Sequence, residues 1–214
     1  TEHYSYGELF NEINRCTGGI GTSLELYNDV TRVKEKAFKA TFEVKGKALY
    51  EKLPVLFSMA AEILTASRLG DERRLKEILA MVKSRLLMRF QSSGHSTAAL
   101  RALSYGSPSA RLKDMTNGID FYRAVAKIEE HFEEEKGQLI RILEELTRRL
   151  FRPDNMMISY TASREGLEGL EEMIRGLKAG LFTEPVEEGS CILHCEKKTE
   201  GFKTASDTES HLKL

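Results

Sequence analysis

Two stretches near the start of the chain carry the hydrophobic pattern of β-strands. Between residues 38 and 45, polar side chains alternate with four apolar ones, namely Phe38, Ala40, Phe42 and Val44. Side chains of an extended chain alternate between two faces, so this stretch predicts a half-buried strand. Apolar positions between Ile20 and Tyr27 predict another strand. Because the connection at 28–36 is short and polar, we expect the two strands to pair antiparallel.

Most of the remaining chain has apolar residues at helical spacing. The N-terminal helix begins at a capping box formed by Ser5 and Glu8, and it ends at Thr17–Gly19. The helix that starts near Leu53 has Pro54 in its first turn, and Asp71 is the predicted N-cap of the next one. The same spacing predicts helices across 53–64, 75–90, 98–103, 121–132, 139–150 and 167–177.

The order of the predicted elements indicates the fold class. The last helix is expected to begin at Ser163 and to end at Gly180, and short strands are expected at 156–160 and 191–195. Helix, two strands, several helices, a strand and a helix follow one another along the chain. This order predicts an α+β fold, with a small, mainly antiparallel sheet and several helices packed on one of its faces.

Composition narrows the classes of function. The 214 residues include 32 basic and 33 acidic side chains, which leaves a formal net charge of -1. A balanced charge predicts no nucleic-acid partner and gives no reason to expect a membrane as partner. Three cysteines are too few for a disulfide scaffold, so a reducing compartment such as the cytoplasm is favoured.

The histidines and cysteines do not predict a metal site. None of the five histidines forms a His-x-x-x-His pair, and His131 is followed by Glu135 where a second zinc-binding histidine would stand. We therefore interpret residues 129–135 as a solvated acidic helix face. Cys191, His194 and Cys195 lie close in sequence, but a strand would turn His194 away from the two thiols. Buried thiols are the favoured interpretation, and we expect no cofactor in this segment.

Signals for a nucleophile or a phosphate loop are weak. His95 and Ser96 are adjacent, and adjacent side chains of an extended segment point apart. The glycine-rich stretch 17–22 lies between a helix and a strand rather than before a helix N-terminus, so a structural turn is favoured over a phosphate site. The residues by themselves indicate an α+β domain without a complete active site.

Four stretches in order resemble one family of enzymes. Residues 9–20 end in Thr-Gly-Gly-Ile after a helix, and 42–47 precede a helix that ends Ala61–Leu64. Residues 93–101 contain Ser-Gly-His, two alanines and an arginine, and 155–162 read Asn-Met-Met-Ile-Ser-Tyr-Thr-Ala. The set resembles the pitrilysin/insulinase family of zinc metallopeptidases, and most closely its presequence-protease branch.

The resemblance implies a position in a longer protein. Members of the family have four homologous domains in two halves that close around a peptide, and the first domain holds the zinc. This chain resembles the third domain, which lacks the metal motif. Residues 1–182 would be that non-catalytic domain without its first strands, and 183–214 would be a linker and the start of a following domain. The chain has no His-x-x-Glu-His, so no catalytic or metal-binding residue is assigned.

The resemblance also sets the expected function and partners. The segment would form part of the wall of a peptide-degrading chamber, with zinc bound elsewhere in the parent enzyme. Gly94 and His95, expected in a polar break at 91–96, are the candidates for a chamber-facing role, although a structural turn there is the simpler interpretation. The alternative is a stand-alone scaffold that pairs with an active peptidase chain.

The resemblance also implies which partners to expect. Expected partners are a peptide substrate through the parent and the missing domains of the same protein or another copy of the chain. The chain begins at Thr1 without an initiator methionine, so we expect either a processed product or a piece cut from a longer polypeptide.

Overall fold

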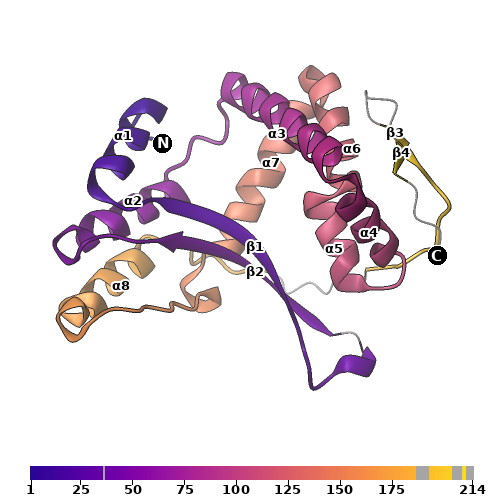
Figure 1. Ribbon diagram of the computed structural model, residues 1–214. Coiled ribbons are helices and arrows are strands. Elements are labelled where there is room, and N and C mark those ends of the chain that lie inside the picture. Colours follow the sequence, from indigo (N-terminus) through magenta and orange to yellow (C-terminus); the bar gives the residue numbers. More distant parts are fainter. Residues whose placement is uncertain (36, 187–192, 204–208, 211–214) are drawn as a thin grey trace. The chain divides into compact units, whose positions relative to one another are not determined.

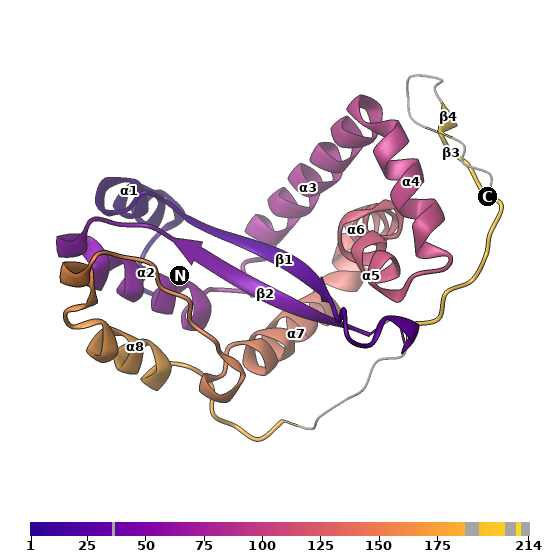
Figure 2. The ribbon, with the colours of Figure 1, turned by 60° about the horizontal axis from the view of Figure 1, so that its bottom comes forward.

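The computed structural model describes residues 1–35, 37–186, 193–203 and 209–210. The chain divides into two compact units (Figures 1 and 2). The first comprises Thr1–Glu25, Thr41–Gly70 and the described residues from 138 to 186. The second comprises Leu26–Ala40, Asp71–Gly137 and the described residues from 193 onward. The helices and the small antiparallel hairpin confirm the α+β class.

The first part of the chain forms a capped helix and a hairpin. Helix α1 spans Tyr6–Cys16, and strands β1 (Ile20–Asn28) and β2 (Phe38–Gly46) pair with each other. The predicted capping box is confirmed: the Glu8 amide donates to Ser5 Oγ and the Ser5 amide donates to Glu8 Oε2. Gly19 adopts a φ of 109° between α1 and β1, a left-handed conformation that glycine accepts without a steric penalty. The stretch around Gly19 is therefore a turn between a helix and a strand.

The rest of the first unit consists of helices joined by irregular segments. It contains α2 (Leu53–Thr65), the C-terminal part of α7 (Phe132–Leu150) and α8 (Leu170–Ala179). Helix α2 packs against both α1 and α8. Leu53, Met59 and Leu64 are its buried residues, while Pro54 lies in its first turn as predicted.

The second unit is a cluster of consecutive helices. These are α3 (Glu72–Ser92), α4 (Gly94–Ser104), α5 (Pro108–Asn117) and α6 (Ile119–Glu130). Helix α3 packs on α6, and α5 packs on both α4 and α6. The predicted cap of α3 is confirmed, because Asp71 Oδ1 accepts a hydrogen bond from the Arg74 amide. Two short strands, β3 (Phe202–Lys203) and β4 (Glu209–Ser210), pair antiparallel.

In the described part of the chain, four short 3₁₀ segments join these elements. They span Val33–Glu35, Tyr50–Lys52, Pro153–Asn155 and Arg164–Leu167. The last of these corrects the prediction of one helix from Ser163. Gly169 adopts a φ of 69°, so the backbone leaves the right-handed helical region there and α8 begins only at Leu170. The predicted end of α8 at Gly180 is confirmed.

The strand predicted at Met156–Tyr160 is wrong. Residues 156–163 are irregular, and the described part of the chain offers them no pairing strand. Side-chain hydrogen bonds hold the segment instead. The Tyr160 hydroxyl donates to the Gly166 carbonyl oxygen at 2.7 Å, and the Ser163 amide donates to the Tyr50 hydroxyl at 3.1 Å. Local apolar character therefore led to the wrong element, because a strand also requires a partner.

The helical part of the prediction needs three corrections. The polar break at 91–96 shrinks to Ser93, and Gly94 begins α4. The predicted helix 121–132 ends at Glu130, because His131 adopts non-helical angles and Phe132 starts α7. Helix α5, which the apolar spacing did not predict, has only one buried residue, Asp114. A helix buried through a carboxylate carries no hydrophobic signal.

The strand expected at Cys191–Cys195 falls partly outside the described residues. Residues 193–195 are described and are not part of a strand. The predicted division of the chain into residues 1–182 and 183–214 stays a prediction. Across the described residues, every helix is too short or too polar to traverse a lipid bilayer.

Candidate functional site

The most concentrated polar chemistry lies in the second unit, at Arg101 on α4. Only 5% of Arg101 is exposed, although its guanidinium is charged. It lies on the same helix face as the buried Ala98 and Ala102, three positions after one and one before the other. A buried guanidinium is stable only where carboxylates and hydrogen bonds compensate for the lost water.

Two aspartates from neighbouring helices supply part of that compensation. Asp114 on α5 is fully buried and pairs with Arg101 Nη1. Its other oxygen, Oδ1, accepts a hydrogen bond of 3.0 Å from the Ile119 amide at the start of α6. Asp120, in the first turn of α6, pairs with Arg101 Nη1 at 3.0 Å and also with Arg111. These two side chains fix α4, α5 and α6 to one another.

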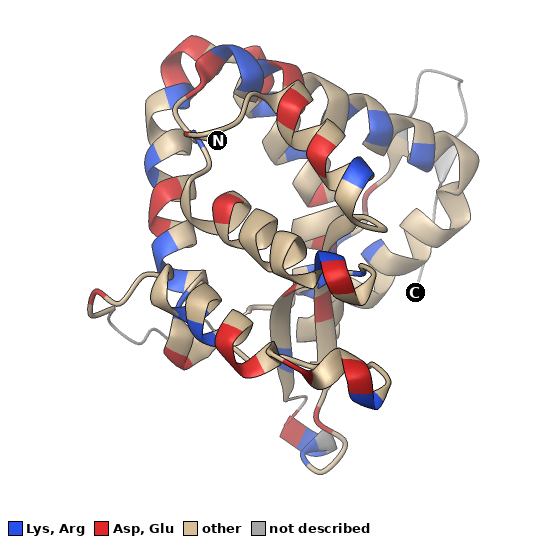
Figure 3. Cartoon of the chain, turned by 90° about the vertical axis from the view of Figure 1, so that its left-hand side faces the viewer, with Lys and Arg blue, Asp and Glu red and all other residues tan. Residues whose placement is uncertain are grey.

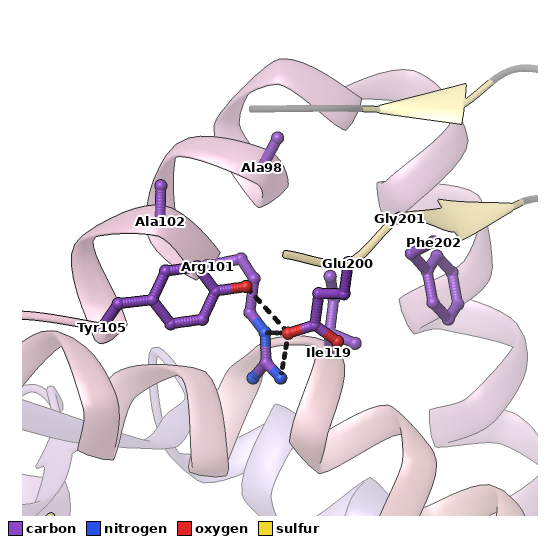
Figure 4. A pocket seen from close by; sticks show the side chains of 8 residues that line it. All are labelled: Ala98, Arg101, Ala102, Tyr105, Ile119, Glu200, Gly201 and Phe202. Atoms are coloured by element: carbon purple, nitrogen blue, oxygen red, sulfur yellow. Dashed lines mark hydrogen bonds and ion pairs between the residues drawn. The ribbon is translucent and has the colours of Figure 1, made fainter. Parts of the chain in front are cut away.

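Glu200 supplies the third carboxylate from a distant part of the chain. Its Oε1 lies 2.7 Å from Arg101 Nε and 2.6 Å from Nη2, and it accepts a hydrogen bond of 2.8 Å from the Tyr105 hydroxyl (Figure 4). Its Oε2 pairs with Arg123 Nη2 at 3.1 Å. We call Arg101, Arg111, Arg123, Asp114, Asp120 and Glu200 the arginine–carboxylate network.

The network favours the charged forms of Arg101, Asp120 and Glu200. Burial would lower the pKa of Arg101, but hydrogen bonds to Asp120 and Glu200 outweigh burial and raise that pKa. Burial would raise the pKa of Glu200, but hydrogen bonds from Tyr105, Arg101 and Arg123 lower it. The pKa of Asp120 is lowered by Arg101 and Arg111 in the same way. Carboxylates so firmly ionised are poor proton donors near neutral pH.

The cavity beside the network is too small for a substrate. Its free space is about 20 Å³, lined by Ala98, Arg101, Tyr105, Ile119, Glu200 and Phe202, among others. A water molecule fits this volume, whereas a ligand pocket measures hundreds of cubic ångströms. The arrangement is therefore a structural ion-pair network.

An apolar cluster adjoins the network. Leu86, Phe90 and Ile119 are buried together, and Phe202 packs on them from the C-terminal segment. The Phe202 ring meets Phe90 and Tyr122 edge to face, with ring centroids 5.4 and 5.5 Å apart. Such pairs contribute roughly 0.5–1.5 kcal/mol each beyond the area they bury.

The candidates named from sequence lie elsewhere on the same helix. Gly94 and His95 occupy the first turn of α4, and His95 is exposed. His95 precedes Arg101 by six residues and contributes nothing to the network. The chamber-facing role of Gly94 and His95 stays a prediction, but their expected position in a polar break is wrong because α4 already begins at Gly94.

The cysteine and histidine cluster lies only partly within the described residues. Cys195 is a free thiol and His194 is exposed, whereas Cys191 is outside the described part. Cys16 is also free and is buried at the end of α1. Among residues that the structure describes, no three His, Cys, Asp or Glu side chains converge on a metal-binding geometry.

Charge is otherwise dispersed. Basic and acidic side chains lie interspersed along the helices (Figure 3). Many of the exposed ion pairs join residues three or four positions apart, such as Arg15 with Glu12 and Arg149 with Glu145. Exposed pairs of this kind contribute little to stability.

Sequence reasoning missed the network for a specific reason. Arg101 stands in one of the stretches that resemble the family, yet nothing in a linear pattern pairs it with Glu200, which lies 99 positions later. One local signal was present: Arg101 shares the apolar face of its helix with two alanines. A charged residue on a buried face requires a partner, although the sequence does not say which one.

These observations define the class of protein: an α+β domain whose chief polar cluster is structural. Residues 1–128 match the profile of the family described as peptidase M16C associated. The match covers more than half of the 214 residues, and the chain belongs to this family.

Named relatives agree with the family. Protein HypA of Clostridium perfringens is 28% identical over 209 residues, which cover 98% of this chain and 21% of that protein. The mitochondrial presequence protease of Xenopus tropicalis is 24% identical over 196 residues, 92% of this chain and 19% of the protease. Presequence protease 1 (chloroplastic/mitochondrial) of Arabidopsis thaliana is 24% identical over 174 residues, 81% of this chain and 16% of the protease. The chain thus spans about a fifth of the length of these relatives.

Proposed function

We propose that this chain is a non-catalytic domain of a zinc metalloendopeptidase and forms part of the wall of a closed chamber in which the parent degrades peptides. The observation that carries the proposal is the match of residues 1–128 to the peptidase M16C-associated family, in a chain without a His-x-x-Glu-His motif. A metallopeptidase needs such ligands to hold zinc and to activate water. Because the sequence has no such motif, we assign zinc to another part of the parent.

The polar chemistry of the domain supports a non-catalytic role. Its most buried charges, Arg101 and Asp114, pair with each other, and Asp114 also anchors the start of α6. The adjacent cavity has room for one water molecule. Groups that are saturated by one another hold helices together and are not available to act on a peptide bond.

Exposed apolar side chains support a role within a larger assembly. Tyr6 and Phe10 on α1 stack with ring centroids 6.2 Å apart, yet they are 66% and 54% exposed. Tyr27 on β1 is 56% exposed. The sheet of β1 and β2 has two strands in the described part of the chain, and a hairpin of two strands is marginal on its own. Other domains of the parent, or a second copy of the chain, would cover these surfaces.

Sequencing of the gene upstream of Thr1 tests whether the chain is part of a zinc metalloendopeptidase. We expect one continuous reading frame that encodes a His-x-x-Glu-His motif several hundred codons earlier. A reading frame that starts close to Thr1 would favour the rival function, a stand-alone scaffold that pairs with an active peptidase chain. The exposed pair Tyr6 and Phe10 is compatible with either partner, so the gene is the decisive observation.

Photo-crosslinking tests the chamber wall directly. The zinc-depleted parent would be illuminated with an unfolded peptide that carries a photoreactive side chain, and adducts would be located by mass spectrometry. We expect adducts within residues 1–186, with the first turn of α4 around His95 as the candidate. Adducts confined to other domains would contradict the proposal that this chain forms part of the chamber wall. The adducts formed by the His95→Ala variant are compared with those formed by the control variant His131→Ala. The control alters a histidine at the junction of α6 and α7.

A cleavage assay on the chain alone gives the complementary result. With added zinc and a fluorogenic peptide, we expect no turnover and no stoichiometric binding of zinc. Turnover that a chelator abolishes would overturn the non-catalytic assignment.

A further inference from the structure

We propose that helices α3–α6 form a receptor site for a Glu-x-aromatic segment, and that residues 200–202 occupy this site as a detachable anchor. The anchor is Glu200, Gly201 and Phe202, and its receptor is the surface of Arg101, Tyr105, Arg123, Phe90 and Tyr122. The inference concerns the second unit alone and does not depend on the proteolytic role proposed above.

The charge of the receptor selects a carboxylate. Without Glu200, the arginine–carboxylate network keeps three guanidiniums and two carboxylates, Asp114 and Asp120. Both carboxylates meet Arg101 at Nη1, whereas Glu200 meets it at Nε and Nη2. An empty receptor would therefore leave two donor positions of a buried guanidinium without a carboxylate. Leaving a buried charge unpaired is costly, so the site favours an anionic side chain.

The hydrogen-bond geometry adds selectivity. Tyr105 donates its hydroxyl to Glu200 Oε1, and Arg123 reaches Oε2 on the other side of the same carboxylate. Both oxygens of Glu200 are thus bound, Oε1 by Arg101 and Tyr105 (Figure 4) and Oε2 by Arg123. A glutamine of the same shape would retain one acceptor oxygen and present an amide group to Arg123, which is a donor.

The aromatic residue two positions later supplies the apolar contact. In an extended segment, residues i and i+2 lie on the same side, so Glu200 and Phe202 can both face the helices while Gly201 lies between them. Phe202 packs edge to face on both Phe90 and Tyr122, whose rings also contact each other. The receptor thus recognises a carboxylate and an aromatic ring at a fixed spacing.

The anchor differs from the elements that form the body of the unit. Helices α3 to α6 pack directly on one another, with Leu86, Phe90 and Ile119 as a core cluster. The four residues before the anchor, 196–199, are exposed and belong to no helix or strand. The side chains of Glu200 and Phe202 attach the segment to the helices, and β4, which pairs with β3, also contacts α4. This is the arrangement expected of a segment that docks on a preformed surface.

Binding in trans tests the proposal. The full chain with Glu200→Ala and Phe202→Ala would be titrated into a fluorescent peptide of residues 196–203, and binding would be followed by anisotropy. We expect saturable binding to the double variant and at least about tenfold weaker binding to the unmodified chain, whose own anchor competes at a high local concentration. Peptides with Glu200→Gln or Phe202→Ala are expected to bind about tenfold or more weakly.

A receptor variant and a matched control identify the surface. Arg123→Gln, added to the double variant, should weaken the peptide about fivefold, because Arg123 is partly exposed and its pair with Glu200 is of intermediate strength. Arg73→Gln removes an arginine of α3 whose side chain is 92% exposed, and it should leave the affinity unchanged. An equal effect of the two changes would show that the peptide responds to net charge rather than to this site.

The remaining outcomes are decisive as well. If the double variant loses the circular dichroism of folded helices or its cooperative unfolding, residues 200–202 are part of the core and the anchor proposal is overturned. If the peptide does not bind a folded double variant, or if it binds equally well with glutamine at position 200, the receptor is overturned.

Discussion

The guanidinium of Arg101 on α4 meets the carboxylate of Glu200, 99 residues later, with Nε 2.7 Å from Oε1. This contact joins the C-terminal segment to the helices of the second unit. It also completes the charge balance of a buried network that is otherwise local to α4, α5 and α6. The stability of this unit should therefore depend on the network more than on any surface ion pair.

Loss of one buried charge should be costly. Asp114→Asn keeps an acceptor for the Ile119 amide but leaves Arg101 without one carboxylate. We expect a loss of about 3–5 kcal/mol in the free energy of unfolding, because one partner of a buried pair is removed. Native-state hydrogen exchange of α3–α6 amides would measure it. The control Glu145→Gln breaks an exposed pair on α7 and should change stability by less than about 0.5 kcal/mol. Similar values for both would contradict a structural network.

Two side chains of α3 should differ in their contribution to the core. Phe90 is 3% exposed and lies at the centre of the apolar cluster, whereas Met88 is 62% exposed. Phe90→Ala should destabilise the second unit by about 3–5 kcal/mol, since it removes buried area and leaves a cavity. Met88→Ala should cost less than about 0.5 kcal/mol. Urea unfolding followed by near-ultraviolet circular dichroism compares them, and a large effect of Met88→Ala would indicate that another chain covers that surface.

Two glycines should respond to alanine in opposite directions. A Cβ at Gly118 would overlap Asp114 Oδ1 and lie 2.8 Å from the Asp114 Cα, which is backbone and cannot rotate away. We expect Gly118→Ala to cost at least about 2 kcal/mol, as overpacking displaces the start of α6. A Cβ at Gly137 in α7 meets nothing within 4 Å, so Gly137→Ala should stabilise by about 0.5–1 kcal/mol. Thermal melts of the two variants provide the measurement.

The hairpin connection should carry a strongly acidic carboxyl group. Asp29 accepts hydrogen bonds from the Thr31 hydroxyl at 2.6 Å, from Arg32 Nε at 3.0 Å and from the Thr31 amide at 2.9 Å. These bonds lower the pKa of Asp29 to about 2. The folded pKa lies below the unfolded value, so the stabilisation is present above about pH 4 and is lost as the pH falls toward 2.

A carboxyl-carbon NMR titration tests this assignment. Thr31→Val removes the hydroxyl and retains the backbone amide, so the pKa of Asp29 should move up toward its ordinary value without reaching it. An unchanged titration in Thr31→Val would show that the hydroxyl is not the main cause.

Some of these features could be predicted from the sequence by itself. The capping box at Ser5, the cap at Asp71 and the strand around Phe42 were predicted because each depends on residues within a few positions of one another. The family resemblance was likewise carried by short ordered motifs, and the profile match confirms it. Local hydrogen bonding and side-chain periodicity depend only on residues that are close together in the sequence.

The tertiary structure decided what depends on distant partners. Residues 156–160 are apolar, yet they form no strand because no described strand pairs with them. The buried residue of helix α5 is Asp114, and Asp114 is stable there because it pairs with Arg101 of another helix, α4. Glu200 is an ordinary acidic residue in sequence and, in the fold, the half-buried ion-pair partner of the buried Arg101. The sequence by itself thus determined most of the elements and the family. The burial of charge, which needs partners brought together by folding, decided where the polar chemistry lies.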